Sequence, residues 1–373
     1  MMGKILFVGN TAWSMYNFRR FVFEAFLKKG HLVYVVSPKD RIYQRKLADM
    51  GCRCISLSIK SKGVNPLEDI NVMVSLYKII KNLKPDHCFF YTIKPNIYGS
   101  MAASCLRVPH VAVTTGLGYT FITDNLVSKI ANILYKVSLR KARQVWFLNA
   151  DDQEAFLEKE LIKEQQAFIL NGEGVDVEHF NYRPYQTSDL SFLLVARMLW
   201  DKGVGQFVEA AREIKKTHPN ITFKLLGYVG VDNPNAISKK QMDEWIEEGV
   251  VEYLGITQDV RPFIEKSSCI VLPSYYGEGV PLSLLEGAAI GRPVITTNSV
   301  GCKETVEDGK TGFLCEPKNV SSLVNAMEKI IRMPEEELIK MGYRARKRVE
   351  KVFDVRLVID KYVEIVSQIK KQI

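Results

Sequence analysis

Short apolar runs alternate with amphipathic stretches along almost the whole chain. The run at residues 4–8 is followed by a helical pattern over 16–29, a second run at 32–36 and a second helical pattern over 41–50. Continuous apolar runs of this length are typical of strands that are buried on both faces of a parallel sheet, and the stretches between them are typical of crossover helices. The pattern predicts repeated βα units and therefore a doubly wound α/β fold.

The rhythm pauses once, at residues 171–189, where Gly172, Gly174 and Pro184 stand among polar residues. We predict a domain boundary there. The expected domains are an N-terminal Rossmann-like domain over 1–180 and a C-terminal one over 181–352, facing each other across a cleft, with a helix over 353–373 that can pack back on the first domain. The remaining expected strands are residues 54–57, 88–91, 111–114, 145–148, 168–170, 192–196, 223–226, 251–254, 269–272, 294–296 and 313–315.

The composition agrees with two globular domains, because 47% of the 373 residues are hydrophobic and 25% are charged. The seven cysteines are an odd number without a C-x-x-C pair or zinc-like spacing to histidine, so we interpret them as buried free thiols in a reducing compartment. No apolar run has the length of a signal-peptide core or a membrane span. We expect a cytoplasmic protein without an anchor of its own.

The net charge of +9 is unevenly distributed. Residues 1–150 hold 22 Lys and Arg against 7 Asp and Glu, a balance of +15, whereas the rest of the chain has a balance of −6. A basic half beside an acidic half favours an anionic partner for the N-terminal domain, such as a membrane face, a pyrophosphate or a nucleic acid. Ordinary solvated lysines are the alternative.

In the second half, two cations follow a predicted strand. Residues 191–196 lead into Arg197 and then Lys202, and a strongly amphipathic helix begins just after Gly203. Ligands of open α/β sheets bind beyond the carboxyl ends of the strands. An arginine fork, a lysine point charge and a helix N-terminus are suited to phosphate oxygens there, although two surface cations after a strand are also common.

The strand at 269–272 is followed by two carboxylates, Glu278 and Glu286, with Gly279 and Pro281 between them. Pro281 can open a helix, which places Glu286 about one turn inside it. Carboxylates accept hydrogen bonds from vicinal hydroxyls such as those of a ribose or a pyranose, and Gly279 permits a close backbone approach to a phosphate or sugar. Taken alone, such glutamates are more often favourable partners of a helix dipole.

The order of these motifs resembles family 4 glycosyltransferases. The segments that carry the likeness are Arg197-x4-Lys202-Gly, Glu278-x7-Glu286 and Gly301-Cys-Lys-Glu304-x3-Asp-Gly-x2-Gly312. In the N-terminal half, Thr92-Ile-Lys94-Pro95-Asn96-Ile-Tyr-Gly99 and Thr115-Gly116-Leu-Gly118 are similar to the bacterial branch that extends undecaprenyl-diphosphate-linked sugars for capsules, O-antigens or protein glycans. The resemblance covers nearly the whole chain and implies the GT-B fold and a hexosyltransferase.

The resemblance also implies roles for the residues of the C-terminal half. Arg197 and Lys202 would hold the donor diphosphate, Glu286 the ribose hydroxyls and Glu278 the donor sugar, and Gly279 and Val280 complete the donor site. Arg197, Lys202 and Glu278 are the expected catalytic residues of a retaining reaction in which the leaving phosphate helps to deprotonate the acceptor. The donor is expected to be a UDP-sugar, and the transferred group an N-acetylhexosamine.

No Asp-x-Asp signature for a metal-bound diphosphate occurs in the sequence. We therefore expect no cofactor and no metal, with cations and helix dipoles in the metal's place.

The acceptor side is expected in the N-terminal half. Polar groups after the first strand, Asn10, Asn17 and Arg19, suit an acceptor pyrophosphate. The resemblance adds Lys94, Asn96, Thr115 and Gly116. Many family members carry a histidine at the place of Thr115, so a catalytic histidine is in doubt here. His110 stands at the start of a strand, at the wrong end of the sheet, and is expected to be structural; the other histidines (His31, His87, His179 and His218) are assigned no role.

Residues 121–143, from Phe121 to Arg143, combine apolar residues at helical spacing with a row of cations. This stripe can lie on an anionic bilayer, or its apolar side can pack on the sheet while the cations are solvated. On the first alternative the protein is peripheral on the inner face of the cytoplasmic membrane.

The competing functions are a sugar-nucleotide epimerase of the same fold and a nucleic-acid-binding protein. Against the second, the cations are not interleaved with a base-stacking platform, and we expect no nucleic-acid partner.

Overall fold

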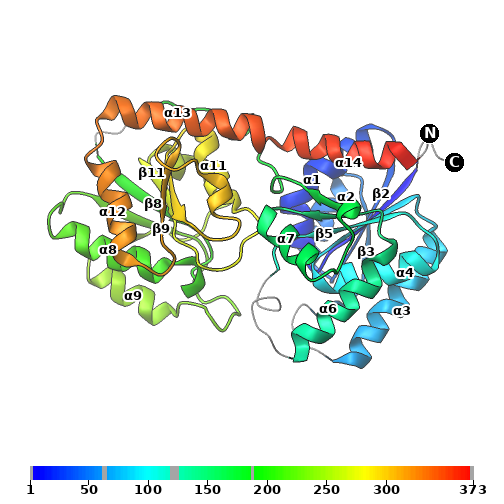
Figure 1. Ribbon diagram of the computed structural model, residues 1–373. Helices are drawn as coiled ribbons and strands as arrows, with labels where there is room; N and C mark the ends of the chain where they lie inside the picture. Colours follow the sequence, from blue (N-terminus) through cyan, green and yellow to red (C-terminus); the bar gives the residue numbers. More distant parts are fainter. Residues whose placement is uncertain (1–2, 61–64, 118–125, 186–188, 370–373) are drawn as a thin grey trace. The chain divides into compact units, whose positions relative to one another are not determined.

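The computed structural model of the protein describes residues 3–60, 65–117, 126–185 and 189–369. The chain divides into two compact units (Figure 1), of which unit 1 comprises residues 1–173 and 355–373 and unit 2 residues 174–354. Residues 174–180 belong to unit 2 because the buried Arg346 donates to the carbonyls of Val177 and Phe180 at 2.9 and 2.6 Å. The backbone N–H of Val175 likewise donates to the carbonyl of Phe353, at 2.8 Å.

Unit 1 is built on a parallel sheet of seven strands in the order β3-β2-β1-β4-β5-β6-β7. Every pair in this sheet is parallel, as the continuous apolar runs predict. Each predicted strand of this half is present, with ends that differ by at most one residue. The strands are β1 (Lys4–Val8), β2 (Leu32–Ser37), β3 (Arg53–Ser56), β4 (His87–Tyr91), β5 (His110–Thr114), β6 (Gln144–Phe147) and β7 (Ala167–Ile169).

Four helices of unit 1 begin at a side-chain cap. The hydroxyl of Thr11 accepts from the N–H of Ser14 at the start of α1, and the side chain of Asn65 accepts from the N–H of Leu67 at the start of α3, where Pro66 fills the first helical position. The helices are α1 (Ala12–Lys28), α2 (Arg41–Asp49), α3 (Pro66–Leu83), the π-helical turn η1 (Pro95–Gly99), α4 (Ser100–Cys105), α6 (Leu126–Ser138), the 3₁₀ turns η2 (Leu139–Lys141) and η3 (Glu164–Gln166), α7 (Ala150–Glu158) and α14 (Val355–Ile369).

Helix α14, the last of the chain, packs against α1 within unit 1 (Figure 1). Its Tyr362 is fully buried, and the hydroxyl oxygens of Tyr362 and Tyr91 lie 2.8 Å apart. The expectation of a C-terminal helix on the N-terminal domain describes this packing.

Unit 2 holds a second parallel sheet, of six strands in the order β10-β9-β8-β11-β12-β13. Its core joins Phe192 and Leu194 of the central strand to Phe207 and Ile214 of the helix that follows. The strands are β8 (Ser191–Val195), β9 (Thr222–Leu226), β10 (Glu252–Tyr253), β11 (Cys269–Leu272), β12 (Val294–Thr297) and β13 (Gly312–Cys315). The helices are η4 (Trp200–Lys202), α8 (Val204–Lys215), α9 (Lys239–Glu247), α10 (Arg261–Glu265), α11 (Leu282–Ile290), η5 (Lys303–Thr305), α12 (Val320–Ile331) and α13 (Glu335–Val352).

The expectation that all seven cysteines are buried is wrong for two of them. All seven cysteines are free, but only five are buried, because Cys54 is half-buried on the edge strand β3 and Cys105 is exposed at the end of α4. An edge strand and a helix end both leave one side of the chain open to water.

None of the described helices is long and apolar enough to cross a bilayer.

Candidate active site

The carboxyl ends of β8, β11 and β12 lie next to one another in the sheet of unit 2, and the loops that leave them pack together. Gly203, with φ of +75°, ends the turn after β8. A Cβ atom there would lie 2.1 Å from the carbonyl oxygen of Pro273, so only glycine lets the first loop approach the loop after β11 this closely. The backbone N–H of Tyr275 completes the contact by donating to the carbonyl of Asp201 at 3.1 Å.

Lys202 and Glu278, predicted for the donor site from separate motifs, form an ion pair between these two loops. Their side chains are only 15% and 13% exposed, so most of the water has been removed from both charges. The hydroxyl oxygen of Ser274 lies 2.9 Å from the Glu278 carboxylate and 3.1 Å from the carbonyl of Asp201, so its single hydrogen is available to either acceptor. The pair is therefore held in one geometry by the fold.

The loop after β12 closes the third side. The N–H of Glu278 donates to the carbonyl of Val300 at 3.3 Å, and the Ser299 hydroxyl donates to the carbonyl of Ser274 at 3.0 Å. Gly301, with φ of +77°, faces the backbone of Glu278 and Gly279: a Cβ atom there would lie 2.3 Å from both carbonyl oxygens. Three loops thus fix the backbone on either side of Glu278.

The other predicted donor residues border the same loops. Arg197 lies two residues after the end of β8, and its side chain is exposed. Within the described chain it forms no hydrogen bond or ion pair. Pro281 caps α11, as the sequence predicts, and Glu286 is half-buried in the second turn of that helix. Val280 is buried and Gly279 half-buried just before it. This edge therefore presents one exposed cation, one paired cation and two carboxylates.

Cys302 lies beside this edge and is fully buried. Burial, together with the negative charge of Glu278, raises the pKa of its thiol to about 11. The thiol is protonated at neutral pH and is not a nucleophile there.

At the carboxyl edge of the sheet of unit 1, the predicted acceptor residues do not form one cluster of accessible groups. Arg19 is buried and forms an ion pair with Glu173, and its guanidinium lies 4.1 Å from the centre of the Tyr91 ring. Burial raises the pKa of the Glu173 carboxyl, and Arg19 opposes that shift. The positive charge of Arg19 is therefore balanced by Glu173 inside unit 1. Such a buried ion pair is typical of a cation with a structural role.

Two residues of the Thr92–Gly99 segment also have internal partners. The ammonium of Lys94 lies 2.7 Å from the carboxylate of Asp69, which accepts a second hydrogen bond from Tyr98 at 2.9 Å. Asn96 is buried in η1 and donates to the carbonyl of Val113 at 3.1 Å. Both side chains hold the π-helical turn against its neighbours in unit 1, α3 and the end of β5.

The remaining predicted acceptor residues are more open. Asn10 follows β1 and is half-buried, Asn17 donates to the carbonyl of Trp13 on α1 at 2.9 Å, and Thr115 and Gly116 follow β5 half-buried, Gly116 with φ of +114°. Gly118 and Phe121, also named from the sequence, lie outside the described residues.

Thr92, the first residue of the Thr92–Gly99 segment, lies at this edge and was given no role from the sequence. It has φ of +70°, a backbone conformation that β-branched residues rarely adopt. Asp152 was missed too: it lies at the start of α7, where burial raises its pKa to about 6 while the side chain of Asn149 donates to it at 3.1 Å.

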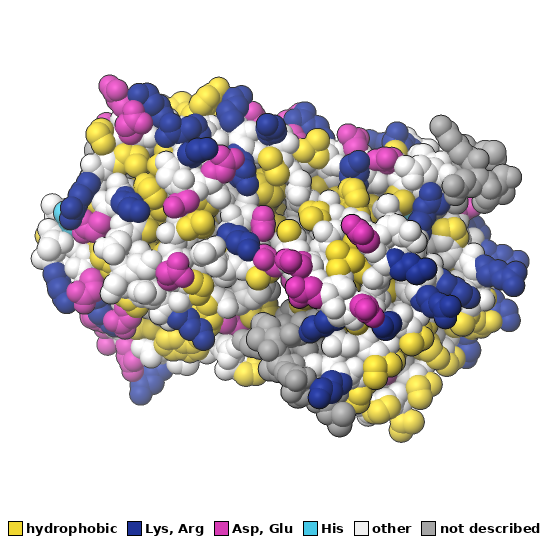
Figure 2. Space-filling model, in the orientation of Figure 1, with side chains coloured by type: hydrophobic (Ala, Val, Ile, Leu, Met, Phe, Trp, Pro, Cys, Tyr) yellow, Lys and Arg dark blue, Asp and Glu magenta, His cyan; other side chains and the backbone are white. Residues whose placement is uncertain are grey.

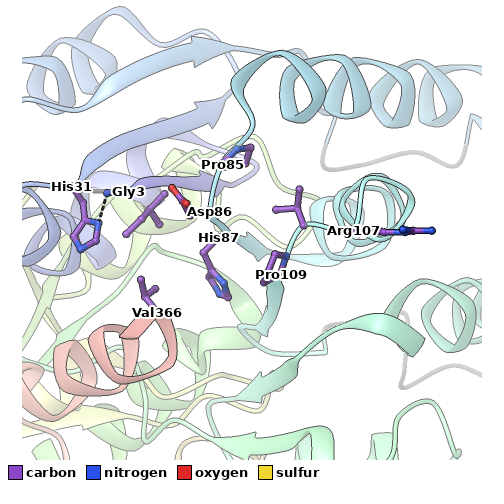
Figure 3. Close-up of a pocket in the computed structure, with 10 residues that line it drawn as sticks. Gly3, His31, Pro85, Asp86, His87, Arg107, Pro109 and Val366 are labelled. Carbon is purple, nitrogen blue, oxygen red and sulfur yellow. Dashed lines mark hydrogen bonds between the residues drawn. The ribbon is translucent and has the colours of Figure 1, made fainter. Parts of the chain in front are cut away.

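The histidines of unit 1 lie at the opposite edge. His110 is buried at the start of β5, and its Nδ1 is 3.0 Å from the carbonyl of Val108, which agrees with the predicted structural role. A cavity of about 200 Å³ opens between the amino ends of β1 and β4 and helix α14, with His31, His87 and Val366 in its lining (Figure 3). Because parallel α/β sheets bind ligands at their carboxyl ends, this cavity is not the predicted site. Among the described residues no three His, Cys, Asp or Glu side chains gather at metal-binding distance.

Comparison with known proteins supplies the identity. Residues 177–348 match the model of "Glycosyl transferases group 1", and residues 4–149 match that of "Glycosyl transferase 4-like". The chain is a glycosyltransferase. Its two Rossmann-like parallel-sheet domains give this glycosyltransferase the GT-B fold, as the motifs of both halves imply, and the family decides between the transferase and the epimerase alternatives.

Two relatives resemble it over most of their length. The N,N'-diacetylbacillosaminyl-diphospho-undecaprenol alpha-1,3-N-acetylgalactosaminyltransferase of Campylobacter jejuni is 28% identical over 390 residues, covering 99% of this chain and 100% of the relative. A UDP-Gal:alpha-D-GlcNAc-diphosphoundecaprenol alpha-1,3-galactosyltransferase of Escherichia coli is 25% identical over 335 residues, covering 82% of this chain and 84% of the relative.

Solved structures agree on the fold. A glycosyltransferase from Rickettsia africae superimposes with a TM-score of 0.81 at 22% identity, covering 99% of each chain. Anabaena HepE in complex with UDP superimposes with a TM-score of 0.80 at 17% identity, covering 98% of this chain and 100% of the other.

Proposed function

We propose that this glycosyltransferase moves a sugar, an N-acetylhexosamine, from a UDP-sugar to an undecaprenyl-diphosphate-linked saccharide, with retention of anomeric configuration and without a metal. The observation that carries the donor half is the convergence of Arg197, Lys202, Glu278 and the start of α11 at the carboxyl edge of one sheet. Cations there stabilise the charge that develops on the leaving diphosphate.

The acceptor half rests on the names of the two relatives, both of which act on a sugar linked to undecaprenol through a diphosphate. The balance of +15 over residues 1–150 supports the same class of substrate, because the acceptor carries a diphosphate and lies in a membrane. We further propose that the enzyme works at the inner face of the cytoplasmic membrane.

The donor and acceptor are tested together. The purified protein is incubated with crude lipid-linked acceptor and each UDP- and GDP-sugar in turn, and products are identified by mass spectrometry, with the anomeric configuration read by NMR. We expect a UDP-N-acetylhexosamine to give the main product and activity to survive excess EDTA. Transfer from a GDP-sugar alone, inversion, or complete loss on chelation that magnesium or manganese restores would each contradict the corresponding part of the proposal.

The site residues are tested by substitution. Arg197→Ala and Lys202→Ala are each expected to lower kcat/KM by roughly 10²-fold, as the loss of one preorganised charge partner does elsewhere. Lys216→Ala is the matched control, because Lys216 is 66% exposed just after the last residue of α8, at the end of the helix that leads to the amino end of β9. Activity near that of the control in both variants would remove the two cations from the donor site.

A further inference from the structure

Helix α3 exposes a row of apolar side chains that the sequence analysis did not single out. Leu67, Ile70 and Val74 are 73%, 52% and 40% exposed and recur at the spacing of one helix face. The opposite face, with Val72, Leu76 and Ile80, is buried in the core of unit 1. The outer row therefore lies outside the core that packs α3 on its sheet.

Helix α6 has a second row of the same kind. Ile130, Ile133 and Val137 are 49%, 63% and 62% exposed, whereas the face turned to the core carries Ala131 and Tyr135. The alternative that the stripe of residues 121–143 packs on the sheet is therefore wrong for these three side chains. Within the described part of the stripe, Leu134 does pack against the core, so the outward apolar row consists of Ile130, Ile133 and Val137.

The two rows form one face of unit 1, which we call the α3/α6 surface: Leu67, Ile70, Val74, Ile130, Ile133 and Val137. Helices α3 and α6 both pack on η1 and α4. Figure 2 shows hydrophobic side chains gathered over both helices, with Lys and Arg around them. Single exposed apolar residues are ordinary, but two aligned rows on neighbouring helices mark an interaction site.

The charges around this surface identify its partner. Helix α6 contains no Asp or Glu, and the two acids of α3, Glu68 and Asp69, are paired with Lys60 and Lys94 at 2.7 Å. The exposed cations around the surface are Lys78, Lys81 and Lys84 at the end of α3, and Lys129, Lys136, Arg140 and Lys141 on and after α6. Apolar rows with a basic surround and few free acids are complementary to a bilayer that contains anionic lipid.

We propose that the α3/α6 surface inserts its six apolar side chains among the acyl chains of an anionic bilayer, with α3 contributing as much as α6. This inference rests on the proposed function, since a membrane-bound acceptor gives the enzyme a reason to dock. It differs from attraction by surface charge alone in one respect: binding must partly survive salt, because apolar burial is not screened.

The test is flotation with vesicles of phosphatidylcholine alone and of phosphatidylcholine mixed with phosphatidylglycerol. The apolar variant carries Leu67→Ser, Ile70→Ser, Ile133→Ser and Val137→Ser, and the charge variant carries Lys136→Gln, Arg140→Gln and Lys141→Gln. We expect the apolar variant to partition at least about 10-fold less on the anionic vesicles at every salt concentration. The charge variant should match wild type at about 1 M salt, where the Debye length is about 3 Å.

A matched control carries Ile246→Ser and Ile256→Ser, two isoleucines of unit 2 that are 41% and 55% exposed. It should bind vesicles as wild type does. Insertion is read directly from the Val137→Trp variant, whose introduced indole should be quenched by lipids brominated on their acyl chains. Wild-type binding by the apolar variant, or an indole signal that stays unquenched on bound vesicles, would overturn insertion.

Transfer to a detergent-solubilised acceptor separates this inference from the proposed function. The apolar variant should keep full activity there and lose it only with acceptor embedded in vesicles. If the wild type transfers no sugar to the solubilised acceptor, the proposed function fails. If it does and the apolar variant still binds vesicles normally, only the insertion fails.

Discussion

Gly301→Ala should lower the activity of the enzyme about 10²-fold through a contact with the backbone of the donor site. Gly301 has φ of +77°, and a Cβ atom there would lie 2.3 Å from the carbonyl oxygens of Glu278 and Gly279. The backbone of Glu278 is held in place by its N–H, which donates to the carbonyl of Val300 at 3.3 Å. The neighbouring loop cannot accommodate the new methyl group by rotating a side chain.

The size of the effect follows from the geometry. A carbon and a carbonyl oxygen in contact are about 3.3 Å apart, so the Glu278 backbone must retreat by about 1 Å or Gly301 must move by as much. A displacement of about 1 Å at reacting groups can cost about 10²-fold in rate. The left-handed backbone adds about 1–2 kcal/mol of destabilisation for alanine, whatever its surroundings.

The Gly309→Ala variant separates the steric contact of a new Cβ atom from the cost of placing alanine in a left-handed backbone. Gly309 has φ of +71° in the same loop region, but a Cβ atom there has no neighbour within 4 Å. Both variants should lose similar backbone stability in urea unfolding, while kcat/KM should fall about 10²-fold further in Gly301→Ala. Equal activity of two equally folded variants would show that this contact does not position Glu278, and the argument would be wrong.

Two further predictions concern unit 1. Burial lowers the pKa of His87 to about 3 and that of His110 to about 4. The unfolded chain binds their protons near pH 6.5 and the folded protein does not, so each should remove about 1.4 kcal/mol of stability per pH unit as the pH falls from about 6.5 toward its folded value. Urea unfolding between pH 7 and 5 checks this, with a shallower slope expected for His87→Leu. Arg19→Leu should cost about 3–5 kcal/mol by leaving Glu173 as an unpaired buried charge, and adding Glu173→Leu should recover part of that loss; a double variant less stable than Arg19→Leu would contradict a simple buried pair.

The strands were predictable because parallel strands buried on both faces read as continuous apolar runs, with ends marked by polar residues. Helix α3 was not predicted from the sequence because its apolar residues are divided between two faces. One row is buried, and the other, at Leu67, Ile70 and Val74, is exposed, so no single apolar stripe marks the helix. The cap at Asn65 followed by Pro66 was the available signal. The π-helical turn η1 has no sequence period that distinguishes it from an ordinary helix start.

For the site, the sequence could place cations and carboxylates beyond strand ends but not decide which side chains would meet. Lys202 and Glu278 pair across 76 positions and Arg19 and Glu173 across 154, and no local pattern specifies either contact. Arg19 in particular looked like a cation free for phosphate, because its partner is distant in sequence. Gly301 stood in a motif, but its role depends on the close approach of a loop that only the fold provides.

On the proposed function, the Lys202–Glu278 pair gives the enzyme a way to favour the transition state. On the proposed function, a bound donor diphosphate competes with Glu278 for the Lys202 ammonium, so part of the attraction is cancelled in the ground state. As the glycosidic bond breaks, the leaving diphosphate gains negative charge and competes more strongly, while Glu278 becomes available to the sugar hydroxyls. An interaction that strengthens along the reaction raises kcat, whereas one that is equally strong throughout lowers KM. Arg197 has no partner to exchange within the described chain. Loss of Lys202 should therefore appear mainly in kcat and loss of Arg197 more in KM, and the reverse division would exclude this exchange of partners.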